Sequence, residues 1–233
     1  MKNILIICLC LLSLSLLAQP MDDEYFYGFK AGATYNSISN ISTTLIPDIF
    51  PKETYSTTNS RQTGFIGGLF FYYRFRNSRI AIQPEVLYAQ EGAKFDYTDI
   101  NDLNYSIDFN YQFLKLATYF KVHSFAGITF SIGPQVALNI GDGKLNYTSN
   151  MPDLGPDLII TQSLREVLKA RPNFAISVGG GYDFDFGLSV EARYNLGLKD
   201  VLETQANGYD FIENENRTNG FQLTIGWLLP FDE

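Results

Sequence analysis

Five charged side chains lie in segments that otherwise alternate between large apolar residues and small or polar ones: Lys30, Glu85, Lys115, Glu191 and Arg193. In β-strands each would share a face with glycines and short polar side chains. Charges gathered on one face could form a structural ion network, or a proton pathway or binding site. Because buried charges are tolerated only when paired, the network is the favoured interpretation. The expected partners of the two glutamates are Lys115 and Arg193, with Lys30 as a further candidate.

Residues that could support hydrolysis, phosphate binding or metal binding are sparse. The one histidine, His123, falls in a predicted short turn, where an exposed polar side chain is the favoured interpretation. The glycines at 179–181 precede another short turn and not a helix, which disfavours a phosphate-binding loop. The acidic residues of the polar connections lack the spacing of a calcium loop. The sequence therefore predicts no catalytic residue, no metal and no cofactor.

The first eighteen residues have the order of a secretory signal peptide. Lys2 precedes an apolar run over residues 4–17, and Ala18 provides a small residue at the expected cleavage site. A lipoprotein is the alternative, but Cys8 and Cys10 each follow a large aliphatic residue, whereas lipid attachment requires small ones. We therefore predict a signal peptide over residues 1–18.

The remaining chain, residues 19–233, contains no cysteine and has a length that suits one domain. It can form no disulfide and has no thiol nucleophile or thiolate metal ligand. The formal net charge of the whole chain is −8, which disfavours nucleic acid as a partner.

Eight segments alternate between apolar and polar side chains, which is the pattern of strands with one face in each environment. The last segment is the clearest: Phe221, Leu223 and Ile225 alternate with Gln222 and Thr224. The eight predicted strands cover residues 25–36, 63–75, 80–97, 105–122, 128–140, 173–182, 188–198 and 221–231.

The connections between these segments alternate between long and short. Long polar connections are predicted at 37–62, 141–172 and 199–219, with a moderately long one at 98–104. The connection at 141–172 contains helical spacing over 157–170, with Asp157 as a candidate cap. Outer-membrane barrels have an even number of strands, short periplasmic turns and longer outer loops.

The apolar faces are long, aromatic and present on nearly every strand. An eight-stranded lumen is barely wide enough for its own side chains, so these faces are expected to point to lipid and the charged faces inward. The sequence predicts an all-β fold: an eight-stranded antiparallel up-and-down transmembrane β-barrel with a filled lumen, long outer loops and short periplasmic turns. Its expected location is the outer membrane of a Gram-negative bacterium.

Four strand motifs carry a resemblance to a known family: Gly-Phe-Lys-Ala-Gly at 28–32, Gly-Phe-Ile-Gly-Gly-Leu at 64–69, Gln-Pro-Glu-Val-Leu-Tyr-Ala-Gln-Glu-Gly-Ala at 83–93 and Glu-Ala-Arg-Tyr-Asn-Leu-Gly-Leu at 191–198. With these motifs the sequence resembles the PorT-like outer-membrane β-barrel family typical of Bacteroidota, over nearly the whole mature chain. The fourth strand departs from the family's Leu-Glu-Ile-Pro core, because Lys115 stands in place of the acidic residue. The resemblance implies loops at the cell surface, and one relative takes part in protein secretion.

The end of the chain resembles the signal that the barrel-assembly machinery recognises. Its residues are Thr224, Gly226, Leu229 and Phe231, although two acidic residues follow the aromatic. The expected partners are therefore outer-membrane lipid, the barrel-assembly machinery and an envelope or secretion protein.

We expect a non-enzymatic integral membrane protein whose surface loops bind a partner or support secretion or the cell envelope. The alternative is a soluble, secreted calycin-like barrel that binds a small apolar ligand. A barrel enzyme is a third hypothesis, which the scarcity of histidine disfavours.

Overall fold

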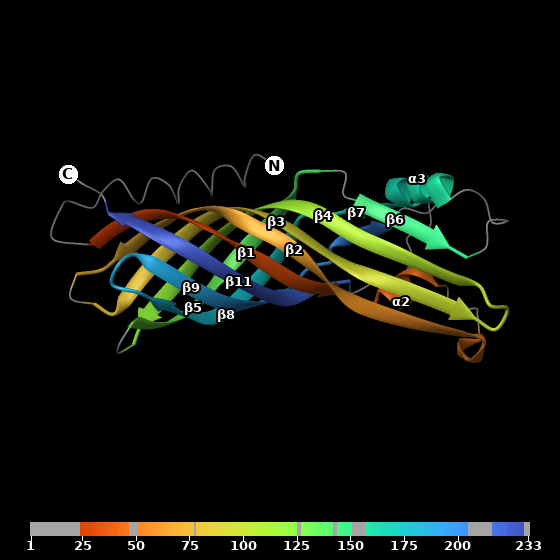
Figure 1. The fold of residues 1–233 in the computed structure, drawn as a ribbon, viewed down its shortest axis with the longest axis horizontal. Helices are drawn as coiled ribbons and strands as arrows, with labels where there is room; N and C mark the ends of the chain where they lie inside the picture. Colours follow the sequence, from red (N-terminus) through yellow and green to blue (C-terminus); the bar gives the residue numbers. More distant parts are fainter. Residues whose placement is uncertain are drawn as a thin grey trace.

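A closed ring of eight antiparallel strands dominates the computed structural model, which describes residues 24–46, 51–76, 78–124, 127–141, 144–150, 157–204 and 216–230 (Figure 1). Each strand of the ring pairs with the next one in the chain, and the last pairs with the first. The predicted all-β, eight-stranded up-and-down barrel is confirmed. The strands are β1 (Glu24–Ile38), β2 (Tyr55–Arg74), β3 (Ile80–Asp99), β4 (Asn104–His123), β5 (Ile128–Asn139), β8 (Asn173–Asp183), β9 (Leu188–Gly197) and β11 (Thr218–Pro230).

The apolar faces of the strands point out of the ring. On β11, Phe221, Leu223 and Ile225 are 54–57% exposed, whereas Gln222 and Thr224 are at most 2% exposed. The other strands of the ring follow the same alternation, so that a belt of large apolar side chains surrounds a polar interior. A soluble carrier with an apolar cavity would have the opposite arrangement, and that alternative is excluded.

The short connections lie together at one end of the barrel. They follow β2, β4 and β8, and β1 begins and β11 ends at this same end. Gly127 and Gly187 have φ angles of 81° and 95°, a left-handed conformation that disfavours residues with a Cβ. The sorting of short turns to one end and long connections to the other agrees with the sequence prediction.

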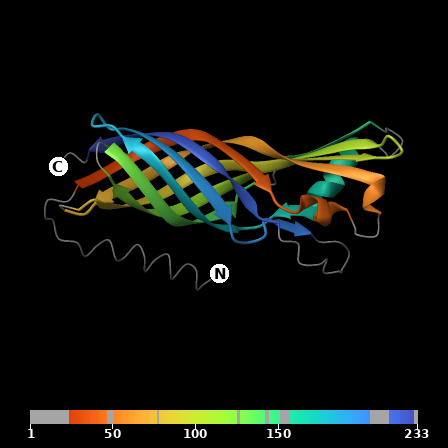
Figure 2. The same cartoon turned by 90° about the horizontal axis from the view of Figure 1, so that it is seen from below.

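At the other end the three consecutive antiparallel strands β2, β3 and β4 extend beyond the ring (Figure 2). A further strand, β6 (Lys144–Ser149), pairs with residues 105–110 of β4, whereas β5 pairs with residues 113–123 of the same strand. We call this region the outer extension: residues 55–62, 93–99 and 104–113, together with β6 and the small elements around it. Those elements are α2 (Ile41–Leu45), the 3-10 helix η2 (Lys52–Thr54), α3 (Asp157–Val167), β7 (Leu168–Ala170) and β10 (Leu202–Thr204).

The outer extension has an apolar core of its own. Phe95, Phe109 and Leu145 are almost completely buried there, between the long strands, β6 and the small elements. The side chain of Thr161 on α3 accepts a hydrogen bond from the Tyr147 backbone N–H at 3.0 Å, and so caps the edge of β6. The long connections are therefore partly ordered, packed structure.

Three predicted loops must be corrected accordingly. The connection 37–62 is too long, because β2 begins at Tyr55 and pairs with β3 through Tyr55↔Asp99. The connection 141–172 contains β6, and its helix ends at Val167 and not at residue 170, because residues 168–170 form β7 against β10. The connection 199–219 contains β10. The polar composition of these segments did not indicate strands, because their exposed faces lie in water.

Among the described residues, no helix has the length and the apolar content needed to cross a bilayer.

Candidate functional site

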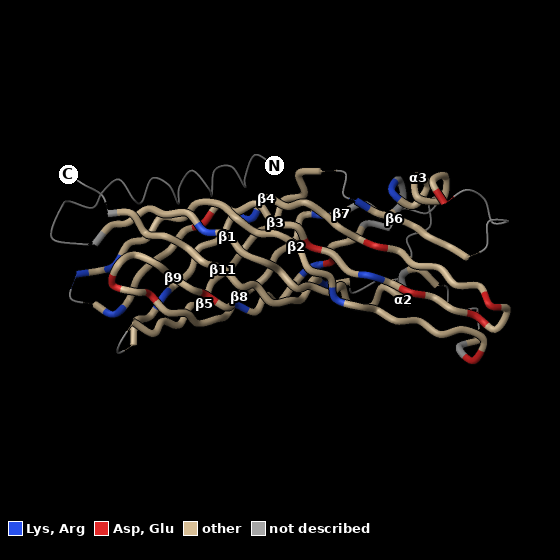
Figure 3. The backbone as a smooth tube through the Cα atoms, in the orientation of Figure 1, with Lys and Arg blue, Asp and Glu red and all other residues tan. Residues whose placement is uncertain are grey.

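The barrel interior holds an ion cluster contributed by three strands far apart in the sequence. Residues of both charge signs occur along the strands of the barrel (Figure 3). The Nζ of Lys30 on β1 lies 2.6 Å from Oε1 of Glu85 on β3 and 2.5 Å from Oε2 of Glu191 on β9. All three side chains are at most 3% exposed. One ammonium group therefore joins two carboxylates across the lumen.

The guanidinium of Arg193 joins the same two carboxylates. Its Nη1 lies 2.9 Å from Glu85 Oε1, and its Nη2 lies 2.9 Å from Glu191 Oε2. The guanidinium also stacks over the ring of Tyr119, 3.7 Å from its centroid. A planar group with five donors suits this position, because its edge bonds the two carboxylates while its face stacks on the ring.

Two glycines of β8 make room for this cluster. Gly179 is opposite Arg193 and Gly181 is opposite Glu191 in the β8–β9 ladder. A Cβ at Gly179 would lie 2.6 Å from Cγ of Arg193, and one at Gly181 would lie 3.0 Å from Cγ of Glu191. The absence of a Cβ at these two glycines therefore lets the side chains of Arg193 and Glu191 pack closely against β8 within the lumen.

The cluster continues towards the short-turn end through residues that sequence reasoning left out. The Nζ of Lys121 lies 3.1 Å from Glu191 Oε1 and 2.8 Å from Asp183 Oδ2. The Nε2 of His123 lies 3.2 Å from that same Asp183 oxygen and 3.0 Å from the hydroxyl of Tyr72. His123 is thus the last residue of β4 and is largely buried, which corrects its interpretation as an exposed turn residue.

Lys115 forms a separate pair. Its Nζ donates to Oε1 of Glu91 on β3, and both side chains are buried. The expectation placed it with Glu85 and Glu191, but it lies six residues from Lys121 along β4, which corresponds to about 20 Å. The β3–β4 register alone does not give this pair, because Lys115 is opposite Leu87, two residues from the partner of Glu85 and four from the partner of Glu91.

The missed residues had a signal in the sequence. Lys121 shares the strand face of Lys115, Glu91 shares that of Glu85, and Asp183 shares that of Gly181. Alternation places all three inside. Lys121 and Glu91 lie within the predicted strands 105–122 and 80–97 and were left out of the network all the same, whereas Asp183 was assigned to a turn because its strand was ended one residue early.

The interior is balanced in charge and rich in hydrogen-bonding groups. Lys30, Lys121 and Arg193 face three carboxylates, and Lys115 faces a fourth. Polar side chains continue the network: Gln83 donates to Glu85 at 2.7 Å, and the Tyr119 hydroxyl donates to Gln135 at 3.3 Å. Buried ions cost several kcal/mol unless they are paired, so these contacts hold the strands in one relative register. Within the described part of the chain, no group of three or more His, Cys, Asp or Glu residues could hold a metal ion.

The C-terminal assembly signal is only partly described. Thr224 and Gly226 are buried on the inner face of β11, and Leu229 is half-buried on its outer face. Phe231 lies outside the described residues, as does the predicted signal peptide, residues 1–18.

The match to a family model agrees with this architecture. Residues 17–203 match the family model described as outer membrane protein beta-barrel domain. Similar solved structures include Neisserial surface protein A (10% identity, 88% of this chain and 97% of the other, TM-score 0.40). OprG from Pseudomonas aeruginosa is also similar (14% identity, 89% and 96%, TM-score 0.43). A third is the attachment invasion locus protein Ail of Yersinia pestis (8% identity, 88% and 99%, TM-score 0.38). No curated protein matches the sequence.

Proposed function

Because the chain belongs to the outer membrane protein beta-barrel domain family and is an integral outer-membrane β-barrel, we propose that it is a non-enzymatic surface protein whose outer extension binds a protein of the cell envelope or of the secretion machinery. The location is the outer membrane of a Gram-negative bacterium. The packed structure beyond the barrel lies in the outer extension, and this favours partner binding over transport or catalysis as the role.

The observation that carries this proposal is the core of the outer extension. Phe95, Phe109 and Leu145 are completely or almost completely buried there, at the level of the long connections and beyond the apolar belt. Strands, a helix and an apolar core hold the outward-facing side chains in fixed positions. Binding residues are commonly placed on loops and edges that a rigid scaffold supports, because preorganisation lowers the entropy lost on binding.

The filled lumen supports the same conclusion. The two carboxylates that Lys30 and Arg193 join lie across the interior, and Tyr119 covers the guanidinium. His123, the one histidine, is held by Asp183 and Tyr72 at the short-turn end, far from the surface loops. A surface hydrolase that used this histidine would need it at the opposite end of the barrel.

The resemblance to PorT-like proteins of Bacteroidota refines the proposal. It favours a secretion or envelope partner over a host or nutrient ligand. In this scheme residues 1–18 are an export signal cleaved after Ala18, and residues 19–233 form the mature barrel. The barrel-assembly machinery recognises the final strand through Thr224, Gly226, Leu229 and Phe231.

Photo-crosslinking in native membranes tests the proposal. A crosslinking amino acid at Lys94, which is exposed on the outer extension, is expected to yield a discrete protein adduct identifiable by mass spectrometry. The matched control is Phe130, which is 60% exposed on the apolar belt and should give lipid adducts only. No protein adduct from Lys94 and from further exposed positions on β3 and β6 would contradict the proposal.

A conductance measurement tests the filled lumen. In planar bilayers the folded protein is expected to give no stable single-channel conductance. Steady ion conduction would show an open path and would favour transport over partner binding.

A further inference from the structure

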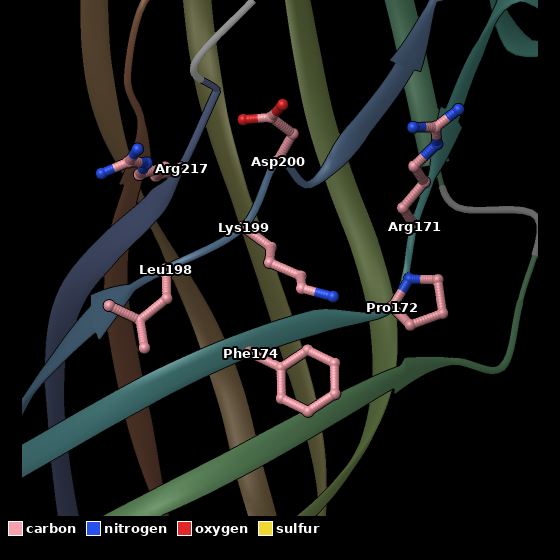
Figure 4. A pocket seen from close by; sticks show the side chains of 7 residues that line it. All are labelled: Arg171, Pro172, Phe174, Leu198, Lys199, Asp200 and Arg217. Atoms are coloured by element: carbon pink, nitrogen blue, oxygen red, sulfur yellow. The ribbon is translucent and has the colours of Figure 1, made fainter. Parts of the chain in front are cut away.

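A depression of about 590 Å³ lies on the outer surface of the barrel at its extension end, where β8, β9 and β11 meet the long connections (Figure 4). It is separate from the ion cluster and from the apolar core of the outer extension. Its lining combines two kinds of side chain, cationic and apolar: Arg171, Pro172, Phe174, Leu198, Lys199, Asp200 and Arg217. We call it the rim pocket.

The rim pocket straddles the outer boundary of the apolar belt. Phe174 and Leu198 are 40% and 46% exposed and share the outward faces of Ile176 and Leu196, which are also exposed. Immediately beyond them the chain becomes polar. The apolar part of the pocket therefore borders lipid acyl chains, and the polar part lies at the level of lipid headgroups.

The charged side chains that line the rim pocket are mostly cationic, in contrast to the whole protein. Three cationic side chains, Arg171, Lys199 and Arg217, accompany one carboxylate, Asp200, in a chain with a formal net charge of −8. The Nζ of Lys199 lies 4.7 Å from the centroid of the Phe174 ring, which places an ammonium directly over the apolar floor (Figure 4). An anion that enters the pocket would thus meet the Lys199 ammonium beside the apolar floor, with Arg171 and Arg217 at opposite ends of the pocket (Figure 4).

Backbone hydrogen bonds fix the walls of the pocket. The N–H of Leu198 donates to the carbonyl of Phe174 at 2.7 Å, and the N–H of Arg171 donates to Val201 at 2.7 Å. The N–H of Val201 donates in turn to the carbonyl of Asn216 at 2.8 Å, next to Arg217. Segments from three parts of the chain are thereby joined, and each of them carries one of the three cationic residues.

We propose that the rim pocket binds the phosphate-bearing headgroup of a lipid in the outer leaflet, whose acyl chains lie along Phe174, Ile176 and Leu198. Guanidinium groups bond phosphate oxygens in a bidentate manner, and an ammonium adds a point charge. Basic pockets at membrane surfaces recognise lipid headgroups in this way. A free phosphate would use the cations alone, whereas a lipid uses both halves of the pocket. This inference concerns a lipid site and is independent of the proposed protein partner.

The test uses the folded protein in phosphatidylcholine nanodiscs that contain either bis-phosphorylated lipid A or its fully dephosphorylated form. Native mass spectrometry measures the lipid A that remains bound. We expect selective retention of the phosphorylated form, with affinity reduced about fivefold for each of Arg171→Gln, Lys199→Gln and Arg217→Gln. Lys94→Gln, which removes an exposed cation of the outer extension, is the control and should retain lipid fully.

Measurements on the unaltered protein keep the test valid if a variant fails to fold. Retention should fall as salt rises, because the contact is electrostatic at an exposed surface. Millimolar inorganic phosphate should displace little lipid. Equal retention of the dephosphorylated lipid, or unchanged retention in a folded triple variant, would overturn the proposal. Displacement by phosphate at equal concentration would assign the pocket to a free anion instead.

Discussion

The barrel and the outer extension are built from the same strands but bury opposite kinds of side chain. On the inner face of β4, Lys115 and Lys121 are buried in the barrel, whereas Phe109 and Phe113 are buried in the extension. On the outer face of β4 the order is reversed: the belt carries an exposed apolar residue, Phe120, and the extension carries a polar one, Asn110. The transition falls at residues 113 and 114, within one continuous strand.

This difference shows that the surroundings of the strand decide which face is apolar. In the belt the strand faces lipid outside, so large apolar residues lie there and paired charges fill the lumen. In the extension the strand faces water outside, and the usual burial of apolar surface holds the sheet to α2 and α3. Backbone geometry is the same in both regions, since β3 and β4 pair from Ile80↔Val122 to Thr98↔Asn104.

The largest effect is expected in the barrel interior. Glu191→Ala removes the carboxylate that contacts Lys30, Lys121 and Arg193. Three buried cations then share two carboxylates, those of Glu85 and Asp183. We expect a loss of about 3–5 kcal/mol in the free energy of unfolding. Urea titration in lipid vesicles, followed by the heat-dependent shift on gels, measures it. Asp96→Ala, which removes an exposed carboxylate, is the control, and an unchanged midpoint for Glu191→Ala would remove the ion cluster from the account of stability.

A cavity in the outer extension should loosen that region alone. Leu145→Ala truncates a buried side chain of β6 and is expected to cost about 2–5 kcal/mol locally. Limited proteolysis should then cleave the segment near α3, while the heat shift of the barrel is retained. Lys144→Ala, at an exposed neighbouring position, should behave as the unaltered protein. Loss of the heat shift would show that the two regions unfold as one.

The stability cost of a lysine on the outer face of β4 should depend on whether lipid or water surrounds that position. Phe120→Lys places a charge on the apolar belt and is expected to cost about 2–4 kcal/mol. Asn110→Lys is on the same face, ten residues away, and should change stability by about 0.5 kcal/mol or less. The vesicle unfolding midpoint distinguishes them. Equal costs would contradict the assignment of the boundary between lipid and water.

Alkaline pH should weaken the outer extension. Burial raises the pKa of Tyr111 above its ordinary value of 10.0, and its hydroxyl donates a hydrogen bond to the Leu168 carbonyl at 3.0 Å. Because the folded-state pKa is the higher one, the stabilisation is complete below about pH 10 and is lost as pH rises above it. Hydrogen exchange near β7 should increase between pH 9 and 11.5 (roughly the range of tyrosine titration). In Tyr111→Phe this pH dependence should be reduced.

Much of the fold could be predicted because its signal is local. Alternation with a period of two identified eight strands and their lipid-facing sides, and the lengths of the connections sorted the two ends. The outer extension was underestimated for a physical reason: the strand 55–62 is mostly polar on both faces, and only its pairing with β3 reveals it. On β4 the sequence does show the change of inner-face residue, from the charged Lys115 to the apolar Phe113.

The candidate site could be predicted less well. The sequence identified the charged residues of the inner face, yet it assigned Lys115 to the wrong carboxylates and omitted Lys121 and Asp183. The alternation of apolar and polar residues along a strand predicts neither the ion partners nor the rim pocket. Both depend on which strands become neighbours and on the register in which they pair.

The sequence by itself therefore determined the type of structure and its surroundings: eight strands, apolar side chains towards lipid and charges within. Only the tertiary structure decided which charges meet. Lys30 and Glu191 are 161 positions apart, and the closure of the ring between β1 and β11 sets their contact. Periodicity is a property of consecutive residues, whereas register is a property of the closed barrel. The pairing of β9 with β8 and β11 brings Arg171, Lys199 and Arg217 to one rim.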